Sequence, residues 1–131
     1  MLDVHLVTPE REVWKGEAIM VVARGVDGDV GILSGHAPML VSLAIGPLFI
    51  HRESAVVSAA VDGGFLHVTG TATDSRVDIL AEHAELESEI DLEAARALAA
   101  EAERQIGERS TDEARADLAR ALARIRVHPD G

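Results

Sequence analysis

The stretch GDVGILSGHAPML, residues 28–40, places three glycines, a histidine and a proline among aliphatic side chains. Glycine carries no Cβ and lets a chain turn tightly or approach another backbone closely, whereas proline favours an extended residue before it. The spacing is not that of a phosphate-binding loop, a dinucleotide fingerprint or a nucleophile elbow. The stretch therefore predicts a stiff, glycine-shaped loop without a catalytic motif, in which Ser34 is a turn residue.

Short apolar runs surround this loop throughout the first 85 residues, and glycine-containing turns such as Asp62-Gly63-Gly64 separate them. Runs rich in β-branched residues at this spacing are typical of a β-sandwich or a barrel. The run at residues 19–23 is apolar at every position, which predicts that both faces of that strand are covered. We therefore expect two packed sheets. Their strands are expected at residues 2–7, 18–23, 48–50, 55–61, 65–68 and 77–81.

The composition changes near residue 85, after which alanine, glutamate and arginine dominate and glycine is found only at positions 107 and 131. This composition is typical of helices. Asp91 is a suitable N-cap for a first helix that runs to about Ile106, and Gly107 is predicted to end it. Ser110 and Glu113 have the spacing of a capping box at the start of a second helix. The short turn between the helices predicts an antiparallel hairpin.

The two predicted helices carry apolar stripes with few large side chains. Roughly forty residues of this composition bury too little apolar surface, at about 25 cal/mol per Å², to fold alone, so the hairpin is expected to dock on another surface. The residues leave open whether the hairpin is a detachable arm or is permanently packed on its own sandwich. The stripes are Ala95, Ala99, Ala102 and Ile106 in the first helix, and Ala114, Leu118, Ala121, Leu122 and Ile125 in the second.

The acidic composition excludes several classes of function. The chain of 131 residues has a formal net charge of −11, which disfavours binding to nucleic acid and to anionic lipid headgroups. It has no cysteine, and its six histidines lack the close spacing of metal ligands. Its apolar runs are far shorter than the roughly 20 residues that span a bilayer. We therefore expect no catalytic residue, no cofactor, no metal site and no direct insertion into lipid.

Four segments together resemble the epsilon subunit of the bacterial-type rotary ATP synthase. They are residues 8–11 (TPER), 28–40, 62–68 (DGGFLHV) and 79–85 (ILAEHAE). The resemblance implies a ten-strand β-sandwich over residues 1–85, bound to the gamma subunit and to the ring of c subunits. It implies a two-helix hairpin over residues 86–131 that acts as a regulatory arm. The chain would then be a non-catalytic part of the central rotor stalk, peripheral to the cytoplasmic face of the bacterial cell membrane.

The residues alone also allow an unrelated β-sandwich adaptor or a small-ligand enzyme. A rotor subunit should copurify from solubilised membranes with gamma and the c ring, whereas a free enzyme should stay in the soluble fraction.

The resemblance assigns three residues of the glycine-rich stretch to the c ring. It implies that Asp29 and His36 face the polar loops of the c subunits, and that Gly31 leaves room for a partner to approach. The alternatives are local roles. Asp29 would then satisfy a turn amide, and His36 would form a hydrogen bond within its own loop.

The second predicted helix carries four arginines, Arg115, Arg120, Arg124 and Arg126. Their simplest role is to solvate one helix face and to complement the helix dipole, each contributing about 0.3–1 kcal/mol. The resemblance implies a sharper role, because the family's hairpin can extend along gamma toward acidic loops of the catalytic alpha and beta subunits. The arginines are then predicted to be inhibitory contacts that block ATP hydrolysis.

One motif of the family is altered at the start of the hairpin. Relatives that bind ATP there resemble Ile/Leu-Asp-x-x-Arg-Ala, whereas this chain has Asp91 followed by Arg96. The arginine is displaced by two positions, a rotation of about 200° on a helix, so Arg96 is not expected to take the place of the family arginine. The sequence therefore predicts no ATP site on the hairpin.

Overall fold

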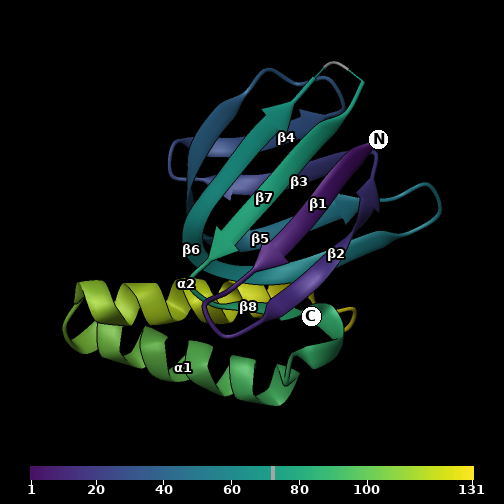
Figure 1. Ribbon diagram of the computed structural model, residues 1–131. Helices are drawn as coiled ribbons and strands as arrows, with labels where there is room; N and C mark the ends of the chain where they lie inside the picture. Colours follow the sequence, from purple (N-terminus) through teal and green to yellow (C-terminus); the bar gives the residue numbers. More distant parts are fainter. Residues whose placement is uncertain (72) are drawn as a thin grey trace.

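The computed structural model describes residues 1–71 and 73–131. Within these residues a β-sandwich of eight strands is followed by a short 3₁₀ helix, η1, and two α-helices (Figure 1). The elements in chain order are β1 (Leu2–Val7), β2 (Glu12–Ala18), β3 (Met20–Gly25), β4 (Gly28–Leu33), β5 (Met39–His51), β6 (Val56–Gly70), β7 (Ser75–Ala81), β8 (Ala84–Leu86), η1 (Glu87–Glu89), α1 (Leu92–Glu108) and α2 (Asp112–Val127). The predicted β-sandwich followed by a helical hairpin is confirmed.

The strands form two layers that share their two longest members. The strand order is β2-β1-β7-β6-β5-β3-β4, and β8 pairs with β6. The β1 and β7 strands are parallel, and the other pairs are antiparallel. Residues 64–70 of β6 pair with β7 in the first layer, whereas residues 59–61 pair with β8 in the second. Both layers are therefore held together by the continuous backbones of β5 and β6.

These long strands explain why eight strands replace the expected ten. The β5 strand has 13 residues and β6 has 15, and each runs from one layer into the other. Asp62-Gly63-Gly64 was predicted to be a turn between strands, but it is a bend inside β6. Gly63 and Gly64 have φ angles of 87° and 129°, which favour glycine and allow the strand to change direction without ending.

The core lies between the two layers and is aliphatic. Alternate residues of each strand point inward, as the two-residue period of a strand requires. The fully buried large side chains are Leu2, Val4, Leu6, Val21, Ile32, Leu48, Ile50, Leu66, Val68, Val77 and Ile79. The run at residues 19–23 was predicted to be covered on both faces, but its outward-facing residues Met20 and Val22 are only half-buried, and Ile19, in the bend before β3, is 44% exposed. Residues 58–62 of β6 are the segment that is buried on both sides.

Three strands were not predicted, namely β2, β4 and the three-residue β8. The β2 strand contains Trp14 and several polar residues, so it lacks a continuous apolar run. The β4 strand contains the first six residues of the glycine-rich stretch that was predicted to be a loop. Gly28, the first residue of β4, and Gly35, in the turn that follows the strand, have positive φ angles of 128° and 82°, whereas Gly31 lies in extended backbone within the strand. The predicted turn at Ser34 is confirmed by the hydrogen bond from the amide of His36 to the carbonyl of Leu33.

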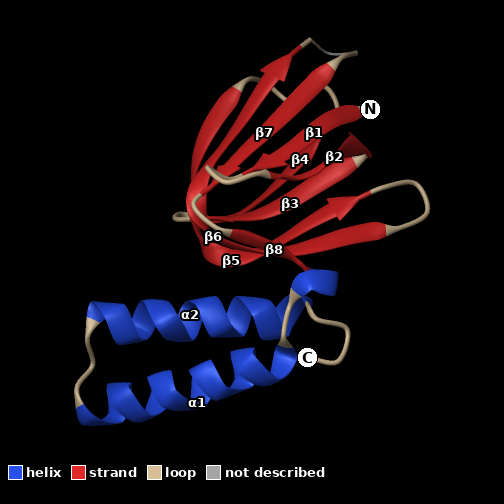
Figure 2. Cartoon of the chain, turned by 60° about the horizontal axis from the view of Figure 1, so that its bottom comes forward, coloured by secondary structure: helices blue, strands red, loops and turns tan. Residues whose placement is uncertain are grey.

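The hairpin lies against the outer face of the second layer (Figure 2). The α2 helix contacts β5 and β6, and α1 packs on α2. Ala123 and Val127 of α2 form a small apolar cluster with Ala60 of β6, Ile90 and Phe49. The expectation that an alanine-rich hairpin must dock is confirmed in this structure. Leu122, predicted to belong to the apolar stripe, is 49% exposed.

The helix ends agree with the sequence in part. Asp91 is the N-cap of α1 and accepts a hydrogen bond from the amide of Ala94, as predicted. Gly107 does not end α1, which continues to Glu108. The predicted capping box of Ser110 is wrong, because Thr111 is the N-cap of α2 and accepts the hydrogen bond from the amide of Ala114.

Candidate functional site

The exposed edge of the second layer holds two of the residues expected at the c ring. Asp29 and Gly31 lie in β4, the last strand of the sheet order, and both are exposed. The Nε of Arg24 on neighbouring β3 lies 3.4 Å from an oxygen of Asp29, so the carboxylate pairs with a side chain across the strands. A Cβ added at Gly31 would meet no atom within 4 Å. The backbone at Gly31 is therefore open to a partner.

His36 lies beyond the other end of β4. Its Nδ1 is 2.7 Å from the carbonyl oxygen of Ala37, which is the local hydrogen bond that the sequence left open. Asp29 and Leu33 are four residues apart in a strand that rises about 3.3 Å per residue, or about 13 Å in all, and His36 follows Leu33 through the turn. The structure thus does not bring Asp29 and His36 together. A partner that contacts both must extend along β4.

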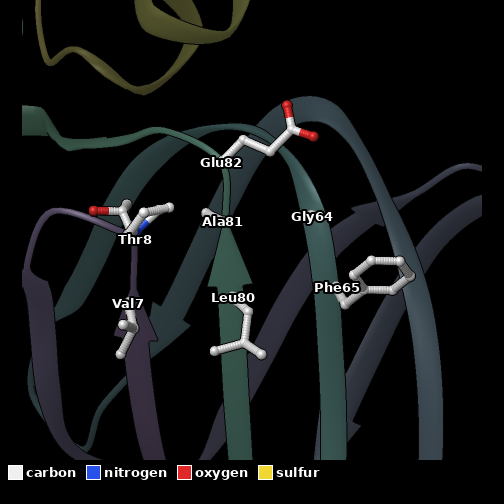
Figure 3. A pocket seen from close by; sticks show the side chains of 8 residues that line it. Val7, Thr8, Gly64, Phe65, Leu80, Ala81 and Glu82 are labelled. Carbon is white, nitrogen blue, oxygen red and sulfur yellow. The ribbon is translucent and has the colours of Figure 1, made fainter.

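A second exposed surface lies on the outer face of the first layer. Val7 pairs with Leu80, and Leu80 pairs with Phe65, so three apolar side chains form a row across β1, β7 and β6. Phe65 is 50% exposed and Leu80 is 53% exposed. Figure 3 shows the three side chains on neighbouring strands. We call Val7, Leu80 and Phe65 the apolar strip.

The apolar strip borders a shallow hollow of about 400 Å³. Thr8 and Pro9, which follow β1, also line it, as does Gly64 next to Phe65. Figure 3 shows Thr8 beyond the end of β1 and Gly64 beside Phe65. Glu82 is a charged residue at the margin of the hollow. The sequence did not predict a site here. Val7, Phe65 and Leu80 lie in runs that were expected only to be strands, and the other lining residues were noted only in the segments that carry the family resemblance or in those strands.

The four arginines of α2 have different surroundings. Arg124 lies between the helix and the sandwich, where both of its terminal nitrogens donate to the two carboxylate oxygens of Asp62 at 2.9 Å. Its Nε donates to Glu85 at 2.5 Å. Burial lowers the pKa of Arg124, but the hydrogen bonds and charges of Asp62 and Glu85 outweigh burial and raise this pKa, so Arg124 stays protonated.

The other three arginines are more exposed. Arg120 donates to Asp117 at 3.0 Å and approaches Asp62 at 3.9 Å. Arg126 is exposed and its guanidinium lies 5.4 Å from the centre of the Phe49 ring. Arg115 pairs with Asp112 in the first turn of its own helix. In this position of the hairpin, Arg120, Arg124 and Arg126 thus all approach side chains of the sandwich, whereas Arg115 pairs within the hairpin.

Two carboxylates of this interface, Asp62 and Glu85, were not predicted. Asp62 is 5% exposed and was assigned to a turn because two glycines follow it. The sequence signal for Asp62 was its place directly after the apolar run at residues 55–61. That position does not indicate which basic side chain would pair with its carboxylate. Arg96, at the start of α1, donates to the carbonyl oxygen of Asp130 near the other end of the hairpin sequence, at 3.0 Å.

The described residues offer little that could hold a cofactor. Among them no group of three or more histidine or acidic side chains gathers in a way that could bind a metal ion. No described helix combines the length and the hydropathy that crossing a membrane requires. The β4 edge and the apolar strip are the candidate surfaces for contacts with other proteins.

Comparisons with known proteins agree with one another. Residues 1–87 match the family model described as the β-sandwich domain of the ATP synthase delta/epsilon chain. An ATP synthase epsilon chain from Thermobifida fusca is 51% identical, covering 96% of this chain and 90% of that relative. The epsilon chain of Moorella thermoacetica is 42% identical, with 96% and 95% covered.

The chain belongs to the ATP synthase delta/epsilon family.

A solved structure extends this result beyond the sandwich. A chain in the OSCP/F1/c-ring structure of the Euglena gracilis mitochondrial ATP synthase is 26% identical, with a TM-score of 0.75. The match covers 95% of this epsilon-family chain and 77% of the Euglena chain, so it includes the hairpin.

The protein is therefore a non-catalytic subunit of the ATP synthase and a part of its central stalk, as the resemblance implied. The alternative of an unrelated adaptor or small-ligand enzyme is not supported.

Proposed function

We propose that this epsilon-family chain joins the gamma subunit to the c ring and carries an arm that inhibits ATP hydrolysis. The apolar strip is the observation that supports the proposed contact with gamma. Two half-exposed large side chains side by side on a chain of net charge −11 are typical of a surface that another protein covers. The resemblance supplies gamma as the occupant of this surface.

The proposed contact with the c ring uses the β4 edge. Asp29, Gly31 and Leu33 all lie on the outer side of this edge strand, and the turn that holds His36 follows it. Backbone groups of an edge strand are free to pair with an incoming segment. Gly31 adds an open stretch of main chain, and Asp29 adds a charge that a polar loop of a c subunit can contact.

The gamma contact is tested with Leu80→Gln and a matched control. Leu80 and Leu122 are similarly exposed, but Leu122 lies on α2 away from the strip. We expect Leu80→Gln to weaken binding of purified gamma about 5- to 30-fold, or about 1–2 kcal/mol, and Leu122→Gln to leave it unchanged. Equal affinities for both variants, with melting temperatures like that of the wild type, would show that gamma binds elsewhere.

The contact with the c ring is tested with Gly31→Val and His36→Ala. The space around Gly31 is open, so we expect the valine variant to keep its melting temperature. Both variants should bind the detergent-solubilised c ring more weakly than the wild type. If they bind the ring as well as the wild type per folded molecule, the glycine-rich stretch has only a structural role.

The proposed inhibitory arm is the hairpin, residues 86–131, acting on the catalytic alpha and beta subunits. Arg115, Arg120, Arg124 and Arg126 supply positive charge that suits acidic loops. Deletion of residues 91–131 removes the hairpin and spares the main core cluster, which contains no helix residue. At equal occupancy in the assembled enzyme, we expect the deletion to raise ATP hydrolysis. Unchanged hydrolysis at both low and moderate salt would leave the hairpin without an inhibitory role.

The location follows from the proposed partners. An ATP synthase is a membrane-bound complex, and a chain held by gamma and the c ring would be peripheral to the membrane. We place it on the cytoplasmic face of the bacterial cell membrane. Accessibility of an added affinity tag to antibody in inverted vesicles, but not in intact cells, is the expected result.

A further inference from the structure

The contact between α2 and the sandwich contains a buried cluster of charges. The side chain of Asp62 is 5% exposed, and that of Arg124 is 15% exposed. Arg124 comes from α2, Asp62 from the bend of β6, and Glu85 from β8, so the cluster joins the hairpin to two strands of the second layer. We call Asp62, Glu85 and Arg124 the latch.

The latch satisfies most of the hydrogen-bonding groups of the guanidinium. Nη1 and Nη2 each donate to one oxygen of Asp62 at 2.9 Å, and Nε donates to Glu85. Nη1 also donates to the carbonyl oxygen of Arg120 at 3.0 Å. Parallel bonds between a guanidinium and a carboxylate fix both distance and orientation. The latch therefore specifies one position of α2 on the sandwich.

The apolar contact beside the latch is small. It joins Ala123 and Val127 to Ala60, Ile90 and Phe49, and two of these five residues are alanines. The α1 helix packs on α2 through alanines and adds no comparable apolar cluster with the sandwich. A large part of the specific attachment of the hairpin thus depends on charged groups.

We propose that Asp62 and Glu85 are a releasable latch that holds the hairpin on the sandwich by occupying Arg124 and, through Asp62, Arg120. The same arginines are then withheld from any acidic partner until the hairpin leaves the sandwich. This inference rests on the proposed inhibitory role, in which those arginines contact acidic loops. Docking on the sandwich and contact with the catalytic subunits become mutually exclusive for Arg124.

A charged latch suits release better than an apolar one. Buried ion pairs add little net stability, because the cost of removing both ions from water offsets their attraction. When the hairpin leaves, Asp62 and Arg124 both regain water, which lowers the free energy of the released state. Removing one partner disfavours docking further, since the remaining charge would be buried without compensation. Replacing both residues by apolar groups removes the cost of burying an unpaired charge, and it also removes the gain from rehydrating the two ions on release.

The test measures the position of the hairpin in the isolated full-length chain. The chain has no cysteine, so cysteines introduced at the exposed residues Glu53 and Glu103 can carry spin labels, and pulsed dipolar spectroscopy reports the distance between them. We expect Arg124→Met and Asp62→Asn to raise the ratio of released to docked hairpin at least tenfold. The double variant Asp62→Leu with Arg124→Met should return the ratio to the wild-type value or below it.

Arg115→Met is the matched control, because the partners of Arg115 among the described residues, Asp112 and Ser110, belong to the hairpin itself. It should leave the distance distribution unchanged. The melting temperature of each variant checks that the sandwich is folded, and Asp62→Asn provides a nearly isosteric change if the leucine variant fails to fold. Poly-glutamate at low salt is the acidic probe, and it should release the wild-type hairpin but not that of the double variant.

Several results would overturn the proposal. A docked hairpin in both Arg124→Met and Asp62→Asn would show that the ion pairs do not hold it. A double variant as released as the single ones would show that shape, and not uncompensated charge, is decisive. No response of the wild type to poly-glutamate would refute competition for the arginines. None of these measurements involves ATP hydrolysis, so the latch can fail while the inhibitory role stands, and the reverse also holds.

Discussion

At Gly64 we expect the addition of a single methyl group to cause a large loss of folding stability. Gly64 has a φ of +129°, and a Cβ there would lie 2.1 Å from the carbonyl oxygen of Leu80 and 2.9 Å from the Cα of Ala81. Gly64→Ala must therefore strain the backbone, at about 1–3 kcal/mol, and displace β7, at about 1–3 kcal/mol more. We expect a loss of about 4 kcal/mol, which lowers Tm by about 12–16 °C in a chain of this size.

Two other glycines of the chain serve as controls. Gly63 has a φ of +87°, but its nearest neighbouring atom would be 3.7 Å away, so Gly63→Ala should cost only about 1–2 kcal/mol. Gly31 lies in extended backbone beside open space, and Gly31→Ala should change stability by less than about 1 kcal/mol. Urea unfolding followed by circular dichroism gives all three values. A Gly64→Ala variant that melts within about 4 °C of the wild type would refute the reasoning, as would a larger loss at Gly63.

Two further predictions concern the stability of the fold at acidic pH and the binding of ATP. The hydrogen bond from Arg11 lowers the pKa of Glu89 below 4.5, assisted by the amide of Leu86. An acid whose pKa is lower in the folded than in the unfolded state stabilises the fold at pH values above its unfolded pKa, and this stabilisation is lost as the pH falls. The difference in Tm between wild type and Arg11→Gln should therefore narrow below about pH 4.5. A difference in Tm that stays constant with pH would contradict this prediction. Because Arg96 is displaced from the family position, calorimetry should detect no ATP affinity tighter than about millimolar, which is about −4 kcal/mol. ATP binding of micromolar affinity that is lost in Arg96→Ala would show that Arg96 does form an ATP site.

The order of the elements could be predicted from local patterns, whereas the continuity of the strands could not. Turn signals and apolar runs located β1, β6 and β7, and the change of composition located the hairpin. Asp62-Gly63-Gly64 is an ordinary turn signal, and only pairing with β7 and β8 makes it a bend within one strand. The glycines of β4 were misleading for the same reason, because pairing with β3 outweighs their weak preference for strands.

The candidate surfaces were predictable to different degrees. Asp29, Gly31 and His36 came from a motif, but the motif could not show that β4 separates Asp29 from His36. The apolar strip depends on which face of each strand points outward, and a single sequence does not reveal this for runs that are apolar throughout. The latch joins residues 62 positions apart in the chain, and no local pattern links them.

The passage of β5 and β6 through both layers has a mechanical consequence. In a sandwich whose layers touch only through side chains, a force applied to one layer can make it slide over the other. Here the path from the β4 edge to Leu80 runs through β3, β5, β6 and β7, all joined by backbone hydrogen bonds. Two unbroken backbones in that path carry the load from one layer to the next. The stiffness of the domain under a twisting load is therefore set by the covalent chain and by strand pairing.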